Sequence, residues 1–336
     1  MKRLLWPLLA LVALLLLNLV LEPSFFSLRL QDGHLYGGTI DVLRNGAPTL
    51  LVALGMTLVI ATRGIDLSVG AIAAIAGAVA CTHIATGGDA VTSMLLALGL
   101  CLVLGLWNGF LVSVLGIQPI IATLVLMTAG RGLAMLITEG QIITVNNDTF
   151  GWVSGGFLVL PVAILIGLVV LGAVALVTRR TALGMLIEAV GVNPEASRLA
   201  GVRSRTIIWT VYVFSGLCAG IAGLMIASNV NAADANSAGL WIELDAILAV
   251  VIGGTSLAGG RYSLMGTLVG ALVIQTLTTT VYTIDVPPDT TLVFKAAVVI
   301  LVCVLQAPQI SGRLRRRRRD TPATPSIQTE PQKVGI

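Results

Sequence analysis

The sequence predicts an all-α membrane protein, a polytopic bundle of about ten transmembrane helices, some of them broken by glycine-rich segments. Hydrophobic residues make up 56% of the 336 residues and charged residues only 11%, whereas soluble domains carry about a quarter charged residues. The apolar runs continue for about twenty residues, the length of a helix that crosses a bilayer. Strands of membrane β-barrels alternate apolar and polar residues instead, over about ten positions.

The apolar segments all belong to one predicted transmembrane domain, residues 1–310. The first segment follows Lys2 and Arg3, is longer than the apolar region of a signal peptide and is not followed by an Ala-x-Ala cleavage site. We therefore interpret it as an uncleaved span. The predicted spans are residues 4–21, 47–62, 67–85, 91–115, 119–137, 157–178, 207–227, 241–258, 264–282 and 291–306.

The basic residues predict the orientation, because cytoplasmic loops are enriched in lysine and arginine. If both termini are cytoplasmic, only Arg29 and Arg44 fall outside, and the outer loops 138–156 and 228–240 contain neither lysine nor arginine. The arginine run 315–319 suits an anchor on anionic lipid better than a nucleic-acid site, because it follows a membrane span. We expect residues 311–336 to form a basic, disordered cytoplasmic tail.

The same orientation places a polar loop, residues 179–205, in the cytoplasm, and its sequence predicts two short helices. Thr181 can cap a first helix that ends at Gly191, and Asn193 followed by Pro194 suits the start of a second helix that ends at Gly201. Such a loop either docks a soluble partner or is a solvated linker, and the helix signals favour docking. An amphipathic face can lie on lipid or fill a groove on the partner. The candidate docking residues are Leu183, Gly184, Leu186, Ile187, Glu188, Gly191, Asn193, Pro194 and Glu195, with Val190 on the same apolar face and Glu188 able to pair with a partner arginine.

Two glycine-rich breaks, residues 62–70 and 252–261, interrupt apolar segments. Non-helical backbone at membrane depth is tolerated only inside protein or beside a water-filled cavity. The breaks therefore supply Asp66, Ser68, Thr255 and Ser256 as candidates for a translocation path. An interfacial position is equally compatible with Asp66, beside Arg63.

Further polar residues lie within spans or in the outer loop before residue 243. Arg131 is deep in a span, so it faces a cavity or another helix, or else extends to the interface. For Lys295, near the start of the last predicted span, extension to the interface is the better explanation. The outer loop is rich in amides and carboxylates, which suit either a hydroxyl-rich ligand or a periplasmic partner. Its path candidates are Asn236, Glu243 and Asp245, the last two also compatible with a plain interfacial position.

No catalytic constellation is found, and we expect no enzyme activity in this chain. There is no Gly-x-x-x-x-Gly-Lys-Ser/Thr phosphate loop, so ATP should bind elsewhere. The four cysteines are isolated within apolar runs, and the two histidines are isolated as well. We therefore expect no metal site and no cofactor bound by this chain.

Three segments resemble a known family. Residues 61–70, ATRGIDLSVG, are similar to the GGIDLSVG signature of ribose-type permeases of carbohydrate ABC importers. Residues 243–261 resemble the second signature of that family, and residues 181–202 resemble the loop that docks on its ATPase. The likeness runs from about residue 41 to residue 305. Within the family, residues 30–33, 138–142 and 233–241 most resemble permeases of galactofuranose importers, whereas Arg63 departs from the usual glycine.

The resemblance implies an inner-membrane permease that moves a monosaccharide, galactofuranose or a ribose- or galactose-like sugar, from periplasm to cytoplasm by alternating access. The implied partners are an ATPase subunit of the twin-domain type, a second permease (a copy of this chain or a sister subunit), a periplasmic sugar-binding protein and the lipid bilayer, with no nucleic acid.

Two other classes of protein fit the sequence less well. An ion- or proton-coupled secondary transporter of a small polar solute would need acidic coupling sites deep in the spans, which have almost none. A membrane enzyme would need clustered ionisable residues at one interface.

Overall fold

We describe the protein from a computed structural model. The structure describes residues 2–21, 23–27, 29–31, 34–155, 160–283, 293, 295–297 and 300. The predicted tail, residues 311–336, and most of the predicted span 291–306 lie outside the described residues.

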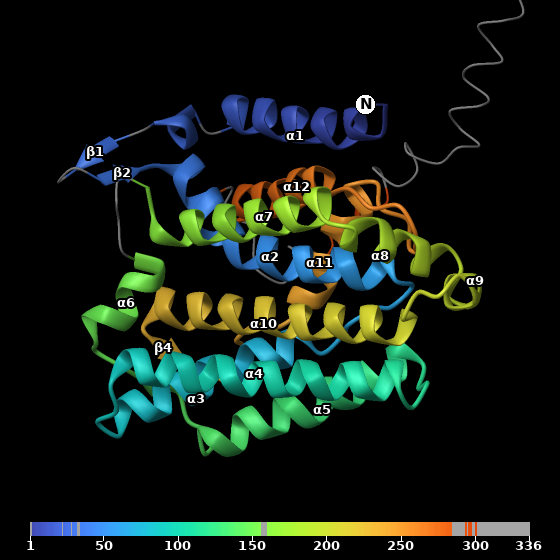
Figure 1. Ribbon diagram of the computed structural model, residues 1–336. Helices are drawn as coiled ribbons and strands as arrows, with labels where there is room; N and C mark the ends of the chain where they lie inside the picture. Colours follow the sequence, from blue (N-terminus) through green and yellow to red (C-terminus); the bar gives the residue numbers. More distant parts are fainter. Residues whose placement is uncertain are drawn as a thin grey trace, which may run out of the picture.

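The long helices lie side by side along one direction (Figure 1). Within the described part of the chain, six helices are long and apolar enough to cross a membrane. They are α2 (Gly38–Ala61), α4 (Ala90–Ser113), α5 (Pro119–Ile137), α7 (Val162–Arg180), α10 (Ser204–Val230) and α12 (Leu264–Thr283). The apolar helix α1 (Lys2–Leu21) packs beside α12.

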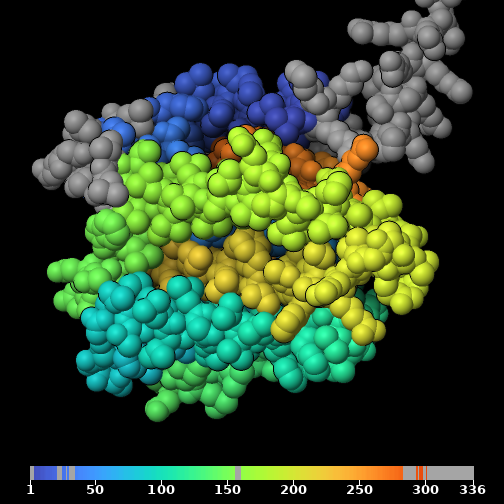
Figure 2. Space-filling view, viewed as in Figure 1, coloured from blue at the N-terminus to red at the C-terminus, as the bar shows by residue number. Residues whose placement is uncertain are grey.

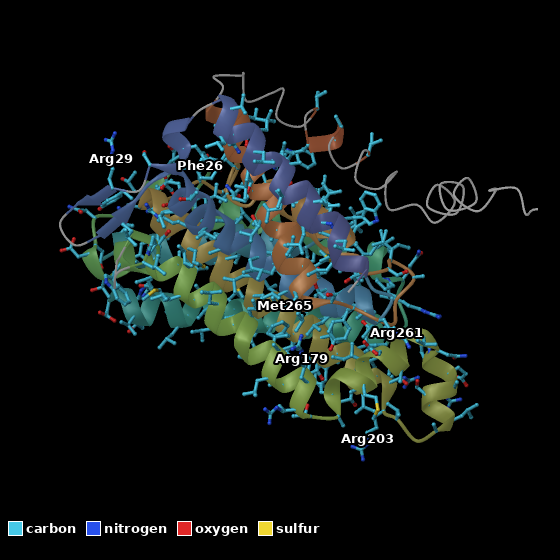
Figure 3. The ribbon with its side chains drawn as sticks, turned by 90° about the horizontal axis from the view of Figure 1, so that it is seen from above. Phe26, Arg29, Arg179, Arg203, Arg261 and Met265 are labelled. Carbon is cyan, nitrogen blue, oxygen red and sulfur yellow. The ribbon has the colours of Figure 1, made fainter. Side chains whose placement is uncertain are left out.

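The two ends of the bundle differ. One end carries the 3₁₀ turn η1 (Pro23–Phe26), the hairpin of β1 (Arg29–Gln31) and β2 (His34–Tyr36), and α6 (Asp148–Gly155). At that end β3 (Ile143–Thr144) pairs antiparallel with β4 (Ala232–Ala233). The other end carries α8 (Leu183–Val192), α9 (Pro194–Leu199) and the N-terminal end of α1. Figure 3 shows Arg29 at the first end and Arg179, Arg203 and Arg261 toward the second.

Helix α2 is the core of the bundle, with every residue from Gly46 to Ala61 buried. It packs against α7, α10, α11 and α12, while α10 also packs against α3 and α4. The outer helices instead expose large apolar side chains such as Leu95, Leu136 and Val169. This arrangement suits a bundle whose outer surface meets hydrocarbon.

Glycines at four-residue spacing, 216/220 and 266/270, let several of these helices approach closely. A Cβ atom at Gly216 of α10 would lie 2.9 Å from the Cα of Gly105 in α4. A Cβ atom at Gly270 of α12 would overlap the backbone of Ala249. Both glycine pairs therefore lie at helix interfaces.

One of the two helices beside each glycine-rich break is shorter than the other membrane helices. Helix α3 (Val69–Ala85) begins after the first break. Helix α11 (Ile242–Ile252) has 11 residues, which span about 16 Å, roughly half a bilayer core. The predicted span 241–258 is therefore wrong in length, because the chain leaves the helix at Gly253 and reaches positive φ at Gly254.

Candidate functional site

The two helices of the loop 179–205 are present at one end of the bundle. The backbone N–H of Leu183 donates to the Thr181 hydroxyl over 3.2 Å at the start of α8. Contrary to prediction, α8 continues through Gly191 to Val192. Gly191 does not end the helix but allows close packing. A Cβ atom there would overlap the carbonyl oxygen of Ala61 and approach the N atom of Gly260 to 2.6 Å.

The apolar face of α8 points into the protein. Ile187 and Val190 are fully buried, and Leu183 and Leu186 are half-buried. Helix α8 borders an apolar cavity of about 210 Å³, lined in part by Leu58, Val174, Leu183, Ile187 and Phe214. In the space-filling view a hollow separates α7 from α10, with α2 visible at its floor (Figure 2).

Ile187 and Val190 therefore pack against the bundle itself and not against lipid or a partner groove. The described structure leaves a different face of α8 exposed, formed by Met185, Ala189 and Val192, with exposed fractions of 69% for Met185 and 61% for Val192. Leu199 of α9, the helix that packs against α8, is 77% exposed. We call Met185, Ala189, Val192 and Leu199 the outward face.

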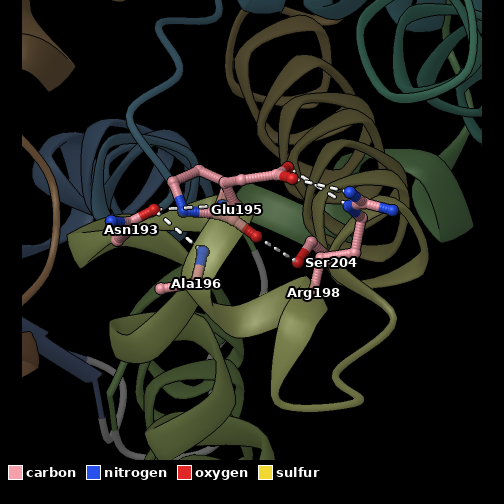
Figure 4. A network of polar contacts seen from close by, with 6 residues as sticks. Asn193, Glu195, Ala196, Arg198 and Ser204 are labelled. Carbon is pink, nitrogen blue, oxygen red and sulfur yellow. Dashed lines mark hydrogen bonds and ion pairs between the residues drawn. The ribbon is translucent and has the colours of Figure 1, made fainter.

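Helix α9 has the predicted cap (Figure 4). The Asn193 Oδ1 atom accepts from the N–H groups of Glu195 at 3.1 Å and Ala196 at 3.0 Å. The Ser204 hydroxyl donates to the carbonyl oxygen of Pro194 over 3.0 Å, which ties α9 to the start of α10. The Arg198 guanidinium donates to the Glu195 carboxylate and holds the pKa of Glu195 below its usual value, so the carboxylate stays charged at neutral pH.

Glu188 is half-buried and faces the loop between α11 and α12. It lines an open recess with Thr178, Arg179, Tyr262 and Ser263. Burial is the main cause that raises the pKa of Tyr262, and the Glu188 charge adds to it. This recess is open, so a partner arginine can reach Glu188 through it.

Three segments meet beneath α2, beside the C-terminal end of α8. The backbone N–H of Gly260 donates to the carbonyl oxygen of Ala61 over 2.9 Å. The Arg63 guanidinium donates to the carbonyl oxygens of Ala258, at 3.2 Å from Nε, and of Val192. Both glycine-rich breaks thus contact α8, a junction that sequence reasoning did not predict. The described structure also pairs Arg63 with these carbonyls and not with Asp66.

Asp66 and Ser68 belong to a buried polar network. The Ser68 hydroxyl and backbone N–H donate to Asp66 Oδ1 at 2.6 and 3.1 Å, and the Ser215 hydroxyl donates to Oδ2 at 2.8 Å. The Asn108 amide donates to the Ser68 hydroxyl at 2.8 Å. All four residues are at most 1% exposed. Sequence reasoning missed Ser215 and Asn108, although polar residues inside apolar spans are a usable signal.

At the other end, Arg131 of α5 holds the loop between α10 and α11. Its Nη1 atom donates to the carbonyl oxygens of Ala235 at 3.0 Å and Ala238 at 2.6 Å. Arg131 also interacts electrostatically with Glu243, which is 6% exposed. The Glu243 Oε2 atom has no hydrogen-bond partner within the described residues. Arg131 therefore contacts the backbone of this loop, on which Asn236 is exposed.

Lys295 forms an ion pair with Asp245, with Nζ 2.7 Å from Oδ2 and 3.0 Å from Oδ1. The two side chains are 13% and 20% exposed. The expectation that Lys295 extends to the interface is therefore wrong, because a mostly buried carboxylate lies within its reach. In the second break, the Thr255 and Ser256 hydroxyls accept from the N–H groups of Ser263 and Ala258, respectively, and so shape the loop.

This ion pair gives a testable prediction. Lys295→Met should lower thermal stability, because it leaves the Asp245 carboxylate mostly buried without its partner, a change that costs about 3–5 kcal/mol in buried pairs. Lys295→Met combined with Asp245→Asn should recover most of the loss. Melting of the purified protein in detergent measures both variants. Additive losses in the double variant would contradict the pairing.

Comparison with known proteins gives a family for this arrangement. A family model described as "Branched-chain amino acid transport system / permease component" matches residues 38–303. The chain belongs to this permease family. The match covers α2 to α12, including the loop 179–205 and both glycine-rich breaks. No solved structure matches the chain.

Several similar curated proteins are named for sugars. The galactofuranose transporter permease protein YtfT of Escherichia coli K12 is 50% identical over 95% of this chain and 96% of its own length. The fructose import permease protein FruF of Bifidobacterium longum is 42% identical over 94% of this chain and 92% of its own. The ribose import permease protein RbsC of E. coli K12 is 36% identical, with 89% and 92% covered.

Proposed function

We propose that this chain is the inner-membrane permease subunit of an ATP-driven importer that carries a monosaccharide from the periplasm to the cytoplasm. The 50% identity to a galactofuranose permease, over nearly the full length of both chains, is the observation that carries this proposal. Galactofuranose is the substrate that it favours, ahead of fructose or ribose. ATP would be hydrolysed by a partner subunit, since this sequence contains no phosphate loop.

The proposed orientation places the α8–α9 end in the cytoplasm. Arg179, Arg203 and Arg261 lie toward that end, together with the N-terminal end of α1 (Figure 3), and cytoplasmic loops are rich in such residues. With about ten crossings, the C-terminus would also be cytoplasmic. The β3–β4 end would then face the periplasm and the sugar-binding protein.

The outward face is the proposed contact with the ATPase. It exposes three large apolar side chains, Met185, Val192 and Leu199, on a corner held rigid by the Asn193 cap and the Ser204 bond. Apolar side chains presented by a well-ordered helix suit a groove on a soluble partner. A second permease subunit would complete the central path.

The proposal can be tested with the whole importer, this chain with its ATPase and sugar-binding protein, in proteoliposomes. Uptake of radiolabelled galactofuranose should require internal ATP, persist after an ionophore collapses the proton gradient, and exceed uptake of fructose and ribose. Uptake that is independent of ATP but lost with the gradient would refute the proposal in favour of secondary transport. Preferential uptake of another sugar would refute only the substrate.

A further inference from the structure

We infer that Arg63 is a positioning residue that links the movement of α8 to α3 and to the loop between α11 and α12. This inference rests on the proposed function, in which α8 receives force from an ATPase. Arg63 is exposed, yet its side chain joins two segments distant in sequence, Val192 and Ala258.

The first contact is with the end of α8. The last carbonyl groups of a helix have no partner within the helix and carry the negative end of the helix dipole. Val192 is the last residue of α8, and its carbonyl oxygen accepts from Nη2 of Arg63. A permanently charged guanidinium is well suited to this acceptor, and it connects α8 to the chain just after α2.

The second contact is with the loop between α11 and α12. Nε of Arg63 donates to the carbonyl oxygen of Ala258, and the next residue, Gly259, has φ of +82°. A Cβ atom at Gly259 would overlap Cγ of Arg63 and lie 3.0 Å from the carbonyl oxygen of Gly191. Because residue 259 is glycine, the aliphatic part of the Arg63 side chain fits between this loop and α8. One side chain therefore holds α8 and this loop at a fixed separation.

The third link runs along the backbone from Arg63 to α3. Asp66 follows three residues later and is anchored by Ser215 of α10 and by Ser68, the residue before α3. The segment between Arg63 and Asp66 is therefore fixed at both ends by side-chain hydrogen bonds. A displacement of α8 would pull on Arg63 and reach the start of α3 through this segment.

The backbone conformation at Arg63 allows a positioning role to be tested separately from a contribution to folding stability. Its φ of +65° lies in the left-handed region, which glycine adopts without strain and other residues adopt at a cost. Arg63→Gly should therefore relieve backbone strain while removing both contacts of the guanidinium. Folding stability should stay constant or rise, whereas coupling between α8 and the membrane helices should fall.

The test uses the complete importer in proteoliposomes, with sugar uptake and ATP hydrolysis measured on the same vesicles. Arg63→Gly should reduce sugar molecules imported per ATP at least fivefold, with an unchanged or higher melting temperature and unchanged ATPase binding. Arg63→Lys, which keeps the charge but not the two-point geometry, should give an intermediate ratio. Arg261→Gly, which removes an exposed arginine from the same loop, is the matched control and should leave the ratio unchanged.

A second readout does not depend on transport. In the purified permease without its ATPase, spin labels at Met185 and Leu257, both well exposed, should give a broader distance distribution in Arg63→Gly than in the wild type, with the native cysteines replaced in both. An unchanged import ratio and an unchanged distribution would overturn the inference, as would a melting temperature that falls in proportion to uptake. If the wild-type importer shows no ATP-dependent uptake, the proposed function fails instead, and the spin-label distances alone decide whether Arg63 links α8 to the loop.

Discussion

Gly191→Ala should destabilise the permease and prevent its assembly with the ATPase, although alanine is normally the better residue in a helix by about 0.5–1 kcal/mol. The expected change is opposite because the added Cβ atom would overlap the carbonyl oxygen of Ala61 and crowd the N atom of Gly260. Those two atoms are themselves joined by a hydrogen bond, so they cannot move apart independently. Overpacking of this kind costs about 1–3 kcal/mol.

Gly172→Ala is the matched control for this prediction. Gly172 lies within α7, and a Cβ atom there would meet no atom within 4 Å in the described structure. It should therefore leave the melting temperature unchanged or slightly raised. Thermal melting in detergent and ATPase co-purification compare the two variants directly. A Gly191→Ala protein as stable as Gly172→Ala would mean that α8 does not pack closely against the end of α2.

The sequence was sufficient to predict the helical class and most of the long helices, because a continuous apolar run has few alternatives in lipid. The cap of α9 was also predictable, since Asn193 and Pro194 act through neighbouring backbone groups. The predicted ends of helices were wrong where local signals compete. Gly253 ended α11 early, whereas Gly191 did not end α8.

Tertiary contacts explain what the sequence could not predict at the candidate site. The amphipathic pattern of α8 identified an apolar face but not what covers it, and the bundle itself covers Ile187 and Val190. Similarly, Lys295 and Asp245 are 50 residues apart, and no local pattern joins them. The sequence does not show whether Arg63 pairs with the neighbouring acid Asp66, and two distant carbonyl groups bind it instead. Long-range contacts of this kind are invisible to periodicity and spacing.

Introducing charge on the outward face should uncouple the importer without unfolding the permease. Met185→Glu combined with Val192→Glu changes two side chains that are 69% and 61% exposed, so the core is not disturbed. Under the proposed function both would be buried against the ATPase, where a carboxylate must be desolvated without a partner. Loss of a central interface residue costs about 2–4 kcal/mol, so we expect at least tenfold weaker ATPase binding and a similar loss of uptake.

The inward face of α8 offers the control that separates docking from folding. Ile187→Glu places a carboxylate on a fully buried position of the same helix, so it should lower the melting temperature and the amount of folded permease. The double variant on the outward face should melt like the wild type and still fail to retain the ATPase on an affinity column. Equal ATPase retention by that variant and the wild type would show that the partner binds elsewhere. The two sets of variants differ only in which side of α8 carries the new charge. The structure shows which side of this helix is buried, and the sequence pattern does not.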